Sequence, residues 1–309
     1  MNTKKIIILK HGGGELANQL WNYVSIWAYG LEVGAPVRNP SFYEYHYFFR
    51  FLKNESCVTN ITSRLMFRRP RRRSNWINRN QRFKYAQRAW ITEKFHPRCV
   101  FSSETNENKP TLLPPSHPLP PRYESCNRLY FKGWLFRNPA GLSKYGKELR
   151  TAFAPSDTVL KRVDEIIAPL RAKYEKIIGI HIRQGDYKTF KGGKYLISQE
   201  RIREIVSEYA KENILDAAKT AFIIASDGPV DESLYKKLNV HVSKENAVTD
   251  LFLLSKCDAI IGSDSSFGAF AAWFGNIPHV ICKQGPMDWA YYADKTEYFD
   301  NKLSELRHY

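Results

Sequence analysis

The stretch Lys176-Ile-Ile-Gly-Ile-His-Ile-Arg-Gln-Gly-Asp-Tyr187 decides the fold class of this chain. Its first half, Ile177 to Ile182, is a short apolar run that is typical of a strand buried on both faces of a sheet. The polar residues from Arg183 onward predict a loop at the carboxyl end of that strand. Ligands of open α/β sheets bind at this end of the strands. The stretch therefore predicts a parallel sheet and a ligand site together.

Strands and helices alternate along the rest of the C-terminal half. We expect a helix capped by Ser198, a strand over 221–225, a short helix capped by Thr249, a strand over 259–262, a helix over 267–274 and a strand over 279–282. Repeated alternation of this kind predicts a parallel sheet with helices on both faces.

The N-terminal half begins with a similar unit. A strand over 5–9 is followed by Gly12-Gly13-Gly14 and then by apolar residues at helical spacing from Leu16 to Leu31. A strand, a glycine loop and a helix start form an arrangement that can cradle an anion, although a lone glycine cluster can also be only a tight turn. Residues 35–100 show no clean period.

The middle of the chain is less regular. Prolines crowd 109–121 and predict an extended surface segment without helix or ladder. An aromatic strand over 129–134 and a helical region over 142–173 follow. With 309 residues we expect two α/β domains, 1–172 on the acceptor side and 173–309 binding a nucleotide, with the crevice between them.

The net charge of +16 indicates an anionic partner. Residues 64–88 contain ten Lys or Arg side chains, no acid and several interleaved aromatic residues. Such a run is usually a solvated loop. Two sharper interpretations are attraction to an anionic membrane that carries a lipid-linked acceptor, and nucleic-acid binding. We favour the membrane, because no recognisable nucleic-acid module accompanies the charge.

The five cysteines are scattered without the spacing of a zinc site or a disulfide framework, which favours a reducing cytosol. The first residues hold too few apolar positions for a signal sequence, and no stretch reaches the length of a membrane span. We expect a cytoplasmic protein that contacts the membrane peripherally.

Candidate site residues follow predicted strands. They are Asn18, His181, Arg183, Asp186, Asp227, Ser265 and Ser266. An arginine beside serine and glycine amides at helix N-termini can hold a diphosphate and stabilise it as it leaves. The sequence contains no Asp-x-Asp pair through which a metal-bound diphosphate is often held, so a guanidinium must supply that charge. We expect no metal and no cofactor.

Several of these residues, and Asp250 at the start of the short helix near Thr249, also have a structural alternative. His181 can be a satisfied core histidine, and Arg183 can simply pair with Asp186. Ser265 and Ser266 can cap the next helix, a role compatible with phosphate binding because both use the same amides. Asp250 can be an N-terminal helix charge and nothing more.

Four blocks resemble the α-1,2-fucosyltransferases of glycosyltransferase family 11. They are Gly14-Glu-Leu-Ala-Asn-Gln19 with Trp21 and Tyr23, Tyr130-Phe-Lys-Gly-Trp134, His181-Ile-Arg-Gln-Gly-Asp-Tyr187, and the segment from Asp250 through Ser265-Ser-Phe267 to Trp273. The resemblance implies a GT-B fold, two facing Rossmann-like domains, and inverting, metal-independent transfer of fucose from GDP-fucose to a glycan hydroxyl, with α-1,2 linkage to galactose or a similar sugar.

The resemblance also implies roles for individual residues. Arg183 would bind the diphosphate with His181 beside the donor, and Asp250 would read the guanine edge. The remaining donor-binding residues would be Gly14, Asn18, Asp227, Ser265, Ser266 and Phe267, with Asp227 at the nucleoside, the serines at the phosphates and Asn18 reaching the donor phosphate. An inverting transfer also needs a base at the acceptor hydroxyl, and Asp186 and Glu15 are the candidates.

The chain departs from the family pattern at several positions. Gln184 stands where the family has a second arginine, Glu15 and Ala17 replace glycines, and Asp264 replaces an asparagine. A lost cation beside a diphosphate weakens donor binding by about 1.5 to 3 kcal/mol if the family makes that hydrogen bond. The alternatives are therefore a transferase of the same fold that uses another nucleotide sugar, or a basic nucleic-acid-binding protein.

Overall fold

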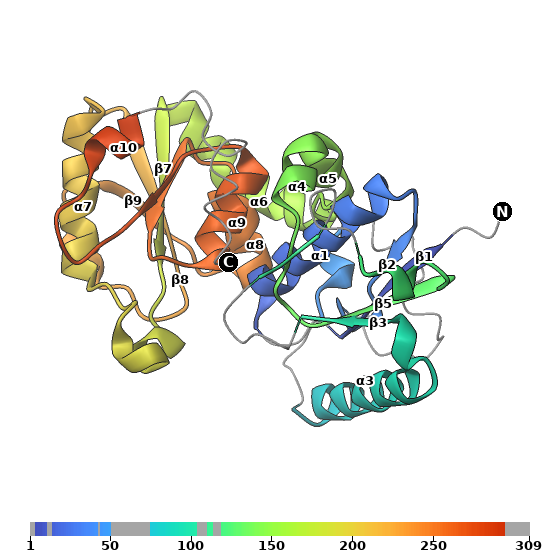
Figure 1. Ribbon diagram of the computed structural model, residues 1–309. Coiled ribbons are helices and arrows are strands. Elements are labelled where there is room, and N and C mark those ends of the chain that lie inside the picture. The colour runs from blue at the N-terminus through green and yellow to red at the C-terminus, as the bar shows by residue number, and fades with distance from the viewer. Residues whose placement is uncertain are drawn as a thin grey trace. The chain divides into compact units, whose positions relative to one another are not determined.

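The computed structural model describes residues 4–10, 14–42, 44–50, 75–103, 110–113 and 119–293, with side chains omitted at 75–82, 84 and 85. Residues 64–74 of the basic stretch lie outside the described residues. The chain forms two compact units, one ending at Ala154 and the next beginning at Pro155 (Figure 1). This boundary precedes residue 172, because helix α6 (Asp157–Lys173) packs on helix α8 (Ala247–Leu254) of the second unit.

The second unit contains a five-stranded sheet in the order β11-β10-β7-β8-β9. Its strands are β7 (Lys176–Ile182), β8 (Thr220–Ser226), β9 (Asn239–Val242), β10 (Ala259–Gly262) and β11 (His279–Ile281). All neighbouring strands are parallel. The chain builds outward from β7 to β9 and then returns to β10 on the other side, so β7 and β10 flank a topological switch point. Ligands of open α/β sheets bind outside the carboxyl ends of the strands at that point.

Helices cover both faces of this sheet (Figure 1). Helices α7 (Gln199–Glu212) and α10 (Trp289–Ala293) lie on one face, and α6, α8 and α9 (Ser266–Gly275) lie on the other. The apolar side chains of α7 pack on β7 and β8 in a core that includes Ile180, Ile205 and Ile224. The buried strands are continuously apolar because both faces are covered, as the sequence predicts.

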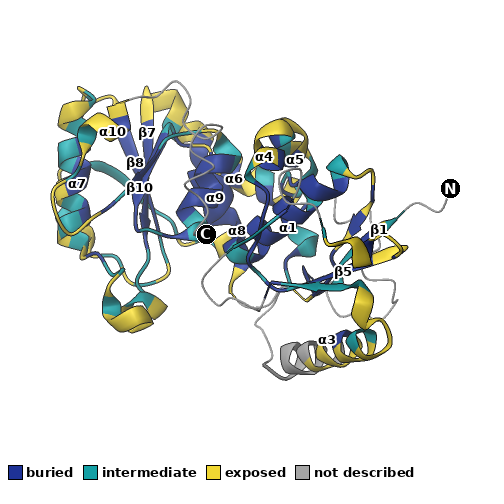
Figure 2. Cartoon of the chain, in the orientation of Figure 1, coloured by how far each residue is buried: buried dark blue, intermediate teal, exposed yellow. Residues whose placement is uncertain are grey.

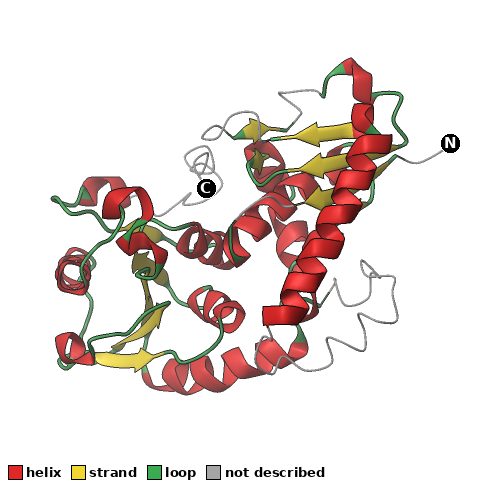
Figure 3. Ribbon diagram, turned by 90° about the horizontal axis from the view of Figure 1, so that it is seen from below, coloured by secondary structure: helices red, strands yellow, loops and turns green. Residues whose placement is uncertain are grey.

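The first unit contains a parallel sheet in the order β2-β1-β5-β3. These strands are β1 (Lys5–Lys10), β2 (Val37–Arg38), β3 (Val100–Ser102) and β5 (Arg128–Lys132). Helix α1 (Leu16–Glu32) contacts α4 (Pro139–Lys144) and α5 (Gly146–Ala152). Helix α3 (Asn75–Phe95) packs Ala89 against Leu9 and Tyr130. Parallel strands in both units confirm the α/β class, and Figure 3 shows them among their helices.

Several local expectations were wrong for identifiable reasons. The cap of α8 is Asn246, not Thr249, because the Asn246 side chain accepts hydrogen bonds from the amides of Val248 and Thr249. The helical region expected over 142–173 was confirmed, and it consists of the three helices α4, α5 and α6. The aromatic strand ends at Lys132, because Gly133 has φ +131°, a conformation that side chains oppose.

Two further expectations failed in the first unit. Within the proline-rich segment, Thr111–Leu112 forms a strand, β4, that pairs in parallel with β6 (Phe136–Arg137), since these residues lie between prolines and keep their N–H groups. Cys99 and Cys126 form a disulfide that their sequence spacing did not indicate.

Candidate functional site

Arg183 lies directly after β7, at the switch point of the second sheet. Its guanidinium pairs with two carboxylates: Nη2 is 2.7 Å from Asp186 Oδ1, and Nη1 is 2.9 Å from Asp227 Oδ2. A quarter of the Arg183 side chain stays exposed. The guanidinium also lies over the ring of Tyr187, 5.6 Å from its centre. The fork is therefore held in one orientation while part of it can still meet an anion.

Asp227, at the end of β8, organises the turn that carries Arg183. Its Oδ1 accepts hydrogen bonds from the amides of Gln184 (2.7 Å) and Gly185 (3.3 Å), while its Oδ2 binds Arg183. Gln184 in turn donates to the Ser226 hydroxyl and to the carbonyl of Pro229. Both oxygens of Asp227 are engaged within the chain, so this side chain positions the arginine.

The segment after β10 lies beside this turn. The Arg183 amide donates to the hydroxyl of Ser263, a fully buried residue whose own amide donates to the carbonyl of His181. Ser265 caps helix α9 by accepting from the amide of Phe267, and Ser266 is the first residue of that helix. A helix N-terminus with amides directed outward is a general anion-binding element.

His181 is a buried, uncharged imidazole. It is 5% exposed and stacks on Phe267 with ring centres 5.0 Å apart. Burial, assisted by the nearby Arg183 charge, lowers its pKa to about 4. The buried His279 of β11 behaves similarly, with a pKa lowered to about 3 by burial and by His181. Gly268 of α9 separates the two rings: a Cβ there would lie 2.8 Å from His279 Nε2 and 3.3 Å from His181 Nδ1.

Asp250 occupies the first turn of α8, where it accepts a short hydrogen bond from the Ser243 hydroxyl. The residue is 8% exposed, and burial raises its carboxyl pKa to about 7. Ser243 follows β9 directly, so Asp250 belongs to the same carboxyl edge of the sheet as Arg183 and Asp227. A buried carboxyl that pairs with no cation among the described residues is suited to accept hydrogen bonds from a ligand.

The first-unit candidates gather at the start of α1. Gly14 has φ +87°, and a Cβ there would lie 2.5 Å from Asn18 Nδ2. The N-cap residue, Glu15, makes no side-chain capping bond, but its Oε2 accepts from the Tyr45 hydroxyl at 3.1 Å. Among the described residues, the α1 start is therefore shaped mainly by the backbone geometry of Gly14.

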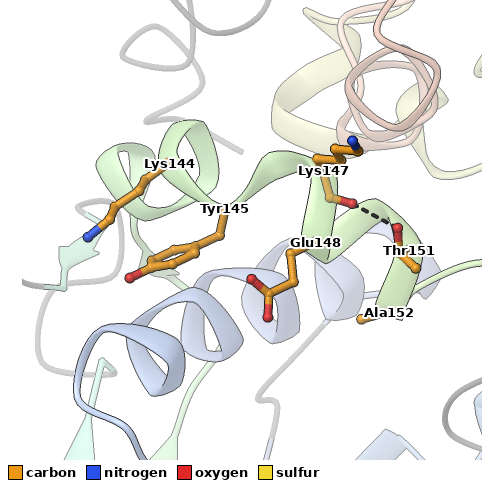
Figure 4. Close-up of a pocket in the computed structure, with 6 residues that line it drawn as sticks. All are labelled: Lys144, Tyr145, Lys147, Glu148, Thr151 and Ala152. Atoms are coloured by element: carbon orange, nitrogen blue, oxygen red, sulfur yellow. Dashed lines mark hydrogen bonds between the residues drawn. The ribbon is translucent and has the colours of Figure 1, made fainter.

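One surface hollow of the described residues lies away from these side chains. A hollow on α4 and α5 is lined by Lys144, Tyr145, Lys147, Glu148, Thr151 and Ala152 (Figure 4). It contains none of the predicted site residues. Within the described part of the chain, no group of three or more His, Cys, Asp or Glu side chains is arranged to hold a metal ion.

Three residues of this arrangement were not predicted as site residues: Ser263, Tyr187 and His279. The Tyr187 hydroxyl donates to the carbonyl of Asp264 at 2.7 Å, and burial raises its pKa to about 12. Ser263 and His279 lie at opposite ends of short strands, one after β10 and one opening β11. In the sequence, the feature that could have identified Ser263 and His279 is a polar residue at the end of a buried strand.

Together these residues place an arginine of fixed orientation, Arg183, beside the N-terminus of α9. Arg183 and the amides at the start of α9 supply hydrogen-bond donors, and Asp250 supplies a hydrogen-bond acceptor on the same edge. This combination can bind a diphosphate joined to a base that has donor groups. It can also stabilise negative charge that develops on a leaving diphosphate.

One protein family matches this chain. The sequence profile of Glycosyl transferase family 11 matches residues 123–284, just over half of the chain. That match covers the block from His181 to Tyr187 and the segment from Asp250 to Trp273. A search of curated protein sequences gave no significant match.

Solved structures share the fold at low sequence identity. POFUT1 in complex with GDP-fucose is similar over 91% of this chain and 98% of that chain, with 11% identity and a TM-score of 0.50. NodZ α-1,6-fucosyltransferase soaked with GDP-fucose covers 88% and 93%, with 15% identity and a TM-score of 0.50. A mutant of Arabidopsis thaliana FUT1 in complex with GDP covers 89% and 70%, with 14% identity and a TM-score of 0.50.

Proposed function

The chain belongs to glycosyl transferase family 11, and we propose that this glycosyltransferase moves fucose from GDP-β-L-fucose to a hydroxyl of a glycan acceptor, with inversion and without a metal. The observation that carries the proposal is the guanidinium of Arg183, fixed by Asp186 and Asp227 at the switch point beside the N-terminus of α9. The acceptor sugar we propose is galactose or a similar hexose, linked α-1,2.

The donor site follows from the charges on the sheet edge. Arg183 and the amides at Ser265 and Ser266 would hold the diphosphate, with His181 and Phe267 beside it. Asp250, ionised, would accept hydrogen bonds from the N1–H and the amino group of guanine. Asp227 would act mainly by holding Arg183, since its oxygens are bound to Arg183 and to the turn amides.

The chemical step needs no redox partner. The acceptor oxygen forms a bond to the anomeric carbon of fucose, the bond from that carbon to the β-phosphate oxygen breaks, and its electron pair stays on GDP. The acceptor proton passes to a carboxylate. Arg183 stabilises the charge that accumulates on the departing diphosphate, and removing one such donor typically costs about 10² to 10³ in rate.

Two carboxylates remain candidates for the base. Asp186 has its Oδ1 on Arg183 Nη2, and Glu15 has its Oε2 bonded to the Tyr45 hydroxyl. Asp186→Asn and Glu15→Gln separate them. The variant that lacks the base should lose more than about a hundredfold in kcat and the acidic limb of the pH profile, while the other should keep that limb. If both variants keep it, neither residue is the base.

Calorimetry tests the donor assignment. GDP, GDP-fucose, GDP-mannose and UDP sugars are titrated in the presence of EDTA. We expect GDP and GDP-fucose to bind and UDP sugars to bind much more weakly, because uracil presents one ring N–H and no amino group to Asp250. Tight UDP binding would mean that the enzyme uses a UDP sugar as its donor. The replacement of the family's second arginine by Gln184 is compatible with such a change of donor. Absence of GDP binding would refute the donor assignment.

The location we propose is the cytoplasmic side of a membrane. None of the helices in the described ranges is long and apolar enough to span a bilayer. Disulfides are rare in a reducing cytosol, so the Cys99–Cys126 pair tests the compartment. Peptide mapping of thiol-blocked protein from cells measures how much of this disulfide forms there, and largely reduced cysteines would support the cytoplasmic location. A disulfide that is complete in cells would place the enzyme in an oxidising compartment.

A further inference from the structure

Helix α3 presents an outer face that combines large apolar side chains with cations. Eight large apolar side chains are strongly exposed among the described residues, and half of them lie on this helix: Phe83, Trp90, Ile91 and Phe95, at 61%, 60%, 47% and 70%. This density on one helix contrasts with the single exposed residues elsewhere, which are ordinary in folded proteins. Figure 2 shows the described part of α3 largely exposed.

The opposite face of α3 is anchored to the first unit. Ala89 is buried against Leu9 and Tyr130, and Glu93, one turn later, pairs with Lys132 of β5 at 2.7 Å. Residues four apart share a helix face. The anchoring face is thus fixed, and the apolar side chains on the other face have no structural task within the described residues.

The charges around this outer face are positive. Arg88 and Lys94 are exposed on α3, and Arg98 is exposed just beyond its end. The Lys94 ammonium lies 5.2 Å from the centre of the Trp90 ring. Glu93 is the sole acid between residues 75 and 103, and Lys132 neutralises it. The sequence that leads into the helix, 64–88, adds further Lys and Arg without any acid.

We propose that the outer face of α3 (Phe83, Arg88, Trp90, Ile91, Lys94 and Phe95) docks the enzyme on an anionic lipid surface. Aromatic and aliphatic side chains enter the boundary between headgroups and acyl chains, and the flanking cations meet anionic headgroups. A second copy of the chain fits less well, because each copy carries a net charge of +16 and the same basic face. Nucleic acid would use the rings and cations but leave Ile91 without a stacking partner.

Vesicle sedimentation with the full chain tests this docking. Vesicles of phosphatidylcholine alone are compared with vesicles that also contain phosphatidylglycerol, at low and at high salt. We expect binding to the anionic vesicles that weakens with salt, and little binding to neutral vesicles. Trp90→Ser with Phe95→Ser, and separately Arg88→Gln with Lys94→Gln, should each lower the partition coefficient at least tenfold.

Matched variants in the second unit serve as controls. Ile214→Ser removes an apolar side chain that is 92% exposed, and Lys161→Gln with Lys211→Gln removes two exposed cations from α6 and α7. Both should bind vesicles within about twofold of the unchanged protein. GDP binding should be unaltered in every variant, so failure of docking and failure of the proposed function give different results.

Three results would overturn the proposal. The first is equal vesicle binding by the α3 variants and the unchanged protein, or no vesicle binding at all. The second is a concentration-dependent dimer in sedimentation velocity that Trp90→Ser with Phe95→Ser abolishes, which would make α3 a self-association face. The third is salt-sensitive binding to single-stranded RNA that Arg88→Gln with Lys94→Gln removes, without vesicle binding.

Discussion

The turn after β7 and the start of α1 occupy corresponding places in the two units, because each follows the first strand of a parallel sheet. They are stabilised differently. After β7, Arg183 is held by two carboxylates and Asp227 binds two backbone amides. At α1, Gly14 adopts φ +87° and Glu15 makes no side-chain capping bond. The geometry of the β7 turn is therefore fixed by ion pairs and hydrogen bonds, and that of the α1 start by backbone conformation. The fixed charge of Arg183 suits the diphosphate that we propose for the β7 turn, whereas the α1 start depends mainly on backbone shape.

The largest effect should come from Arg183. Arg183→Ala should lower kcat by about 10² to 10³, because it removes the charge that meets the leaving diphosphate. Arg183→Lys keeps the positive charge but loses the forked guanidinium. Its kcat should lie between those of Arg183→Ala and the unchanged enzyme. A GDP-release assay measures the rate, and circular dichroism checks the fold. Activity of Arg183→Ala within threefold of the unchanged enzyme would contradict the role.

Asp227→Asn tests whether the second-unit turn is held by charge. The substitution keeps an oxygen for the turn amides but removes one of the two ionic partners of Arg183, so we expect kcat to fall about ten- to a hundredfold. Asp164→Asn, at an exposed position on α6, is the matched control and should change nothing measurable. Equal rates for the two variants would mean that Arg183 stays in place without the Asp227 carboxylate, held by Asp186 alone.

Gly268→Ala tests the packing of His181 and His279 behind the site. Alanine normally stabilises a helix relative to glycine by about 1 kcal/mol, but a Cβ at Gly268 would collide with His279 Nε2 and crowd His181. We therefore expect the opposite sign, a loss of about 1 to 3 kcal/mol in the free energy of unfolding. Urea unfolding measures it, and a gain in stability would show that the two imidazoles can move apart without cost.

Asp250 should make donor binding depend on pH. Its folded pKa is raised to about 7, so this group stabilises the ligand-free fold below about pH 4 and loses that contribution as pH rises to 7. Guanine needs the ionised form, so GDP affinity should increase about tenfold from pH 6 to pH 8. Calorimetry on the unchanged protein and on Asp250→Asn checks this; the variant should bind GDP weakly and without that slope.

The smallest effect should come from the first unit. Gly14→Ala forces a side chain into φ +87° and against Asn18, which should cost about 1 kcal/mol of stability. Gly34→Ala is the matched control, since Gly34 has φ +63° with open space around it. Thermal unfolding compares the two. A larger loss at Gly34 than at Gly14 would mean that contact with Asn18 contributes nothing.

The second unit was more predictable than the first. The strand expected over 259–262 was found with those bounds, and the caps at Ser198 and Ser265 were confirmed by their hydrogen bonds. These features depend on local pattern, which a sequence displays directly. Helix α3 was missed, because its aromatic and basic residues face outward and only a narrow face, at Ala89 and Glu93, is anchored to the first unit.

The sequence by itself determined the α/β class, the strand after which Arg183 lies and the family to which the chain belongs. Only the tertiary structure decided which residues meet there. Asp227 and Ser263 reach the β7 turn from 44 and 80 residues away, as their bonds to Arg183 show. The same holds for the switch point between β7 and β10, the Cys99–Cys126 pair and the exposure of Trp90. Local pattern reports which face of an element is apolar, whereas partners far apart in the chain are chosen by the order in which strands assemble.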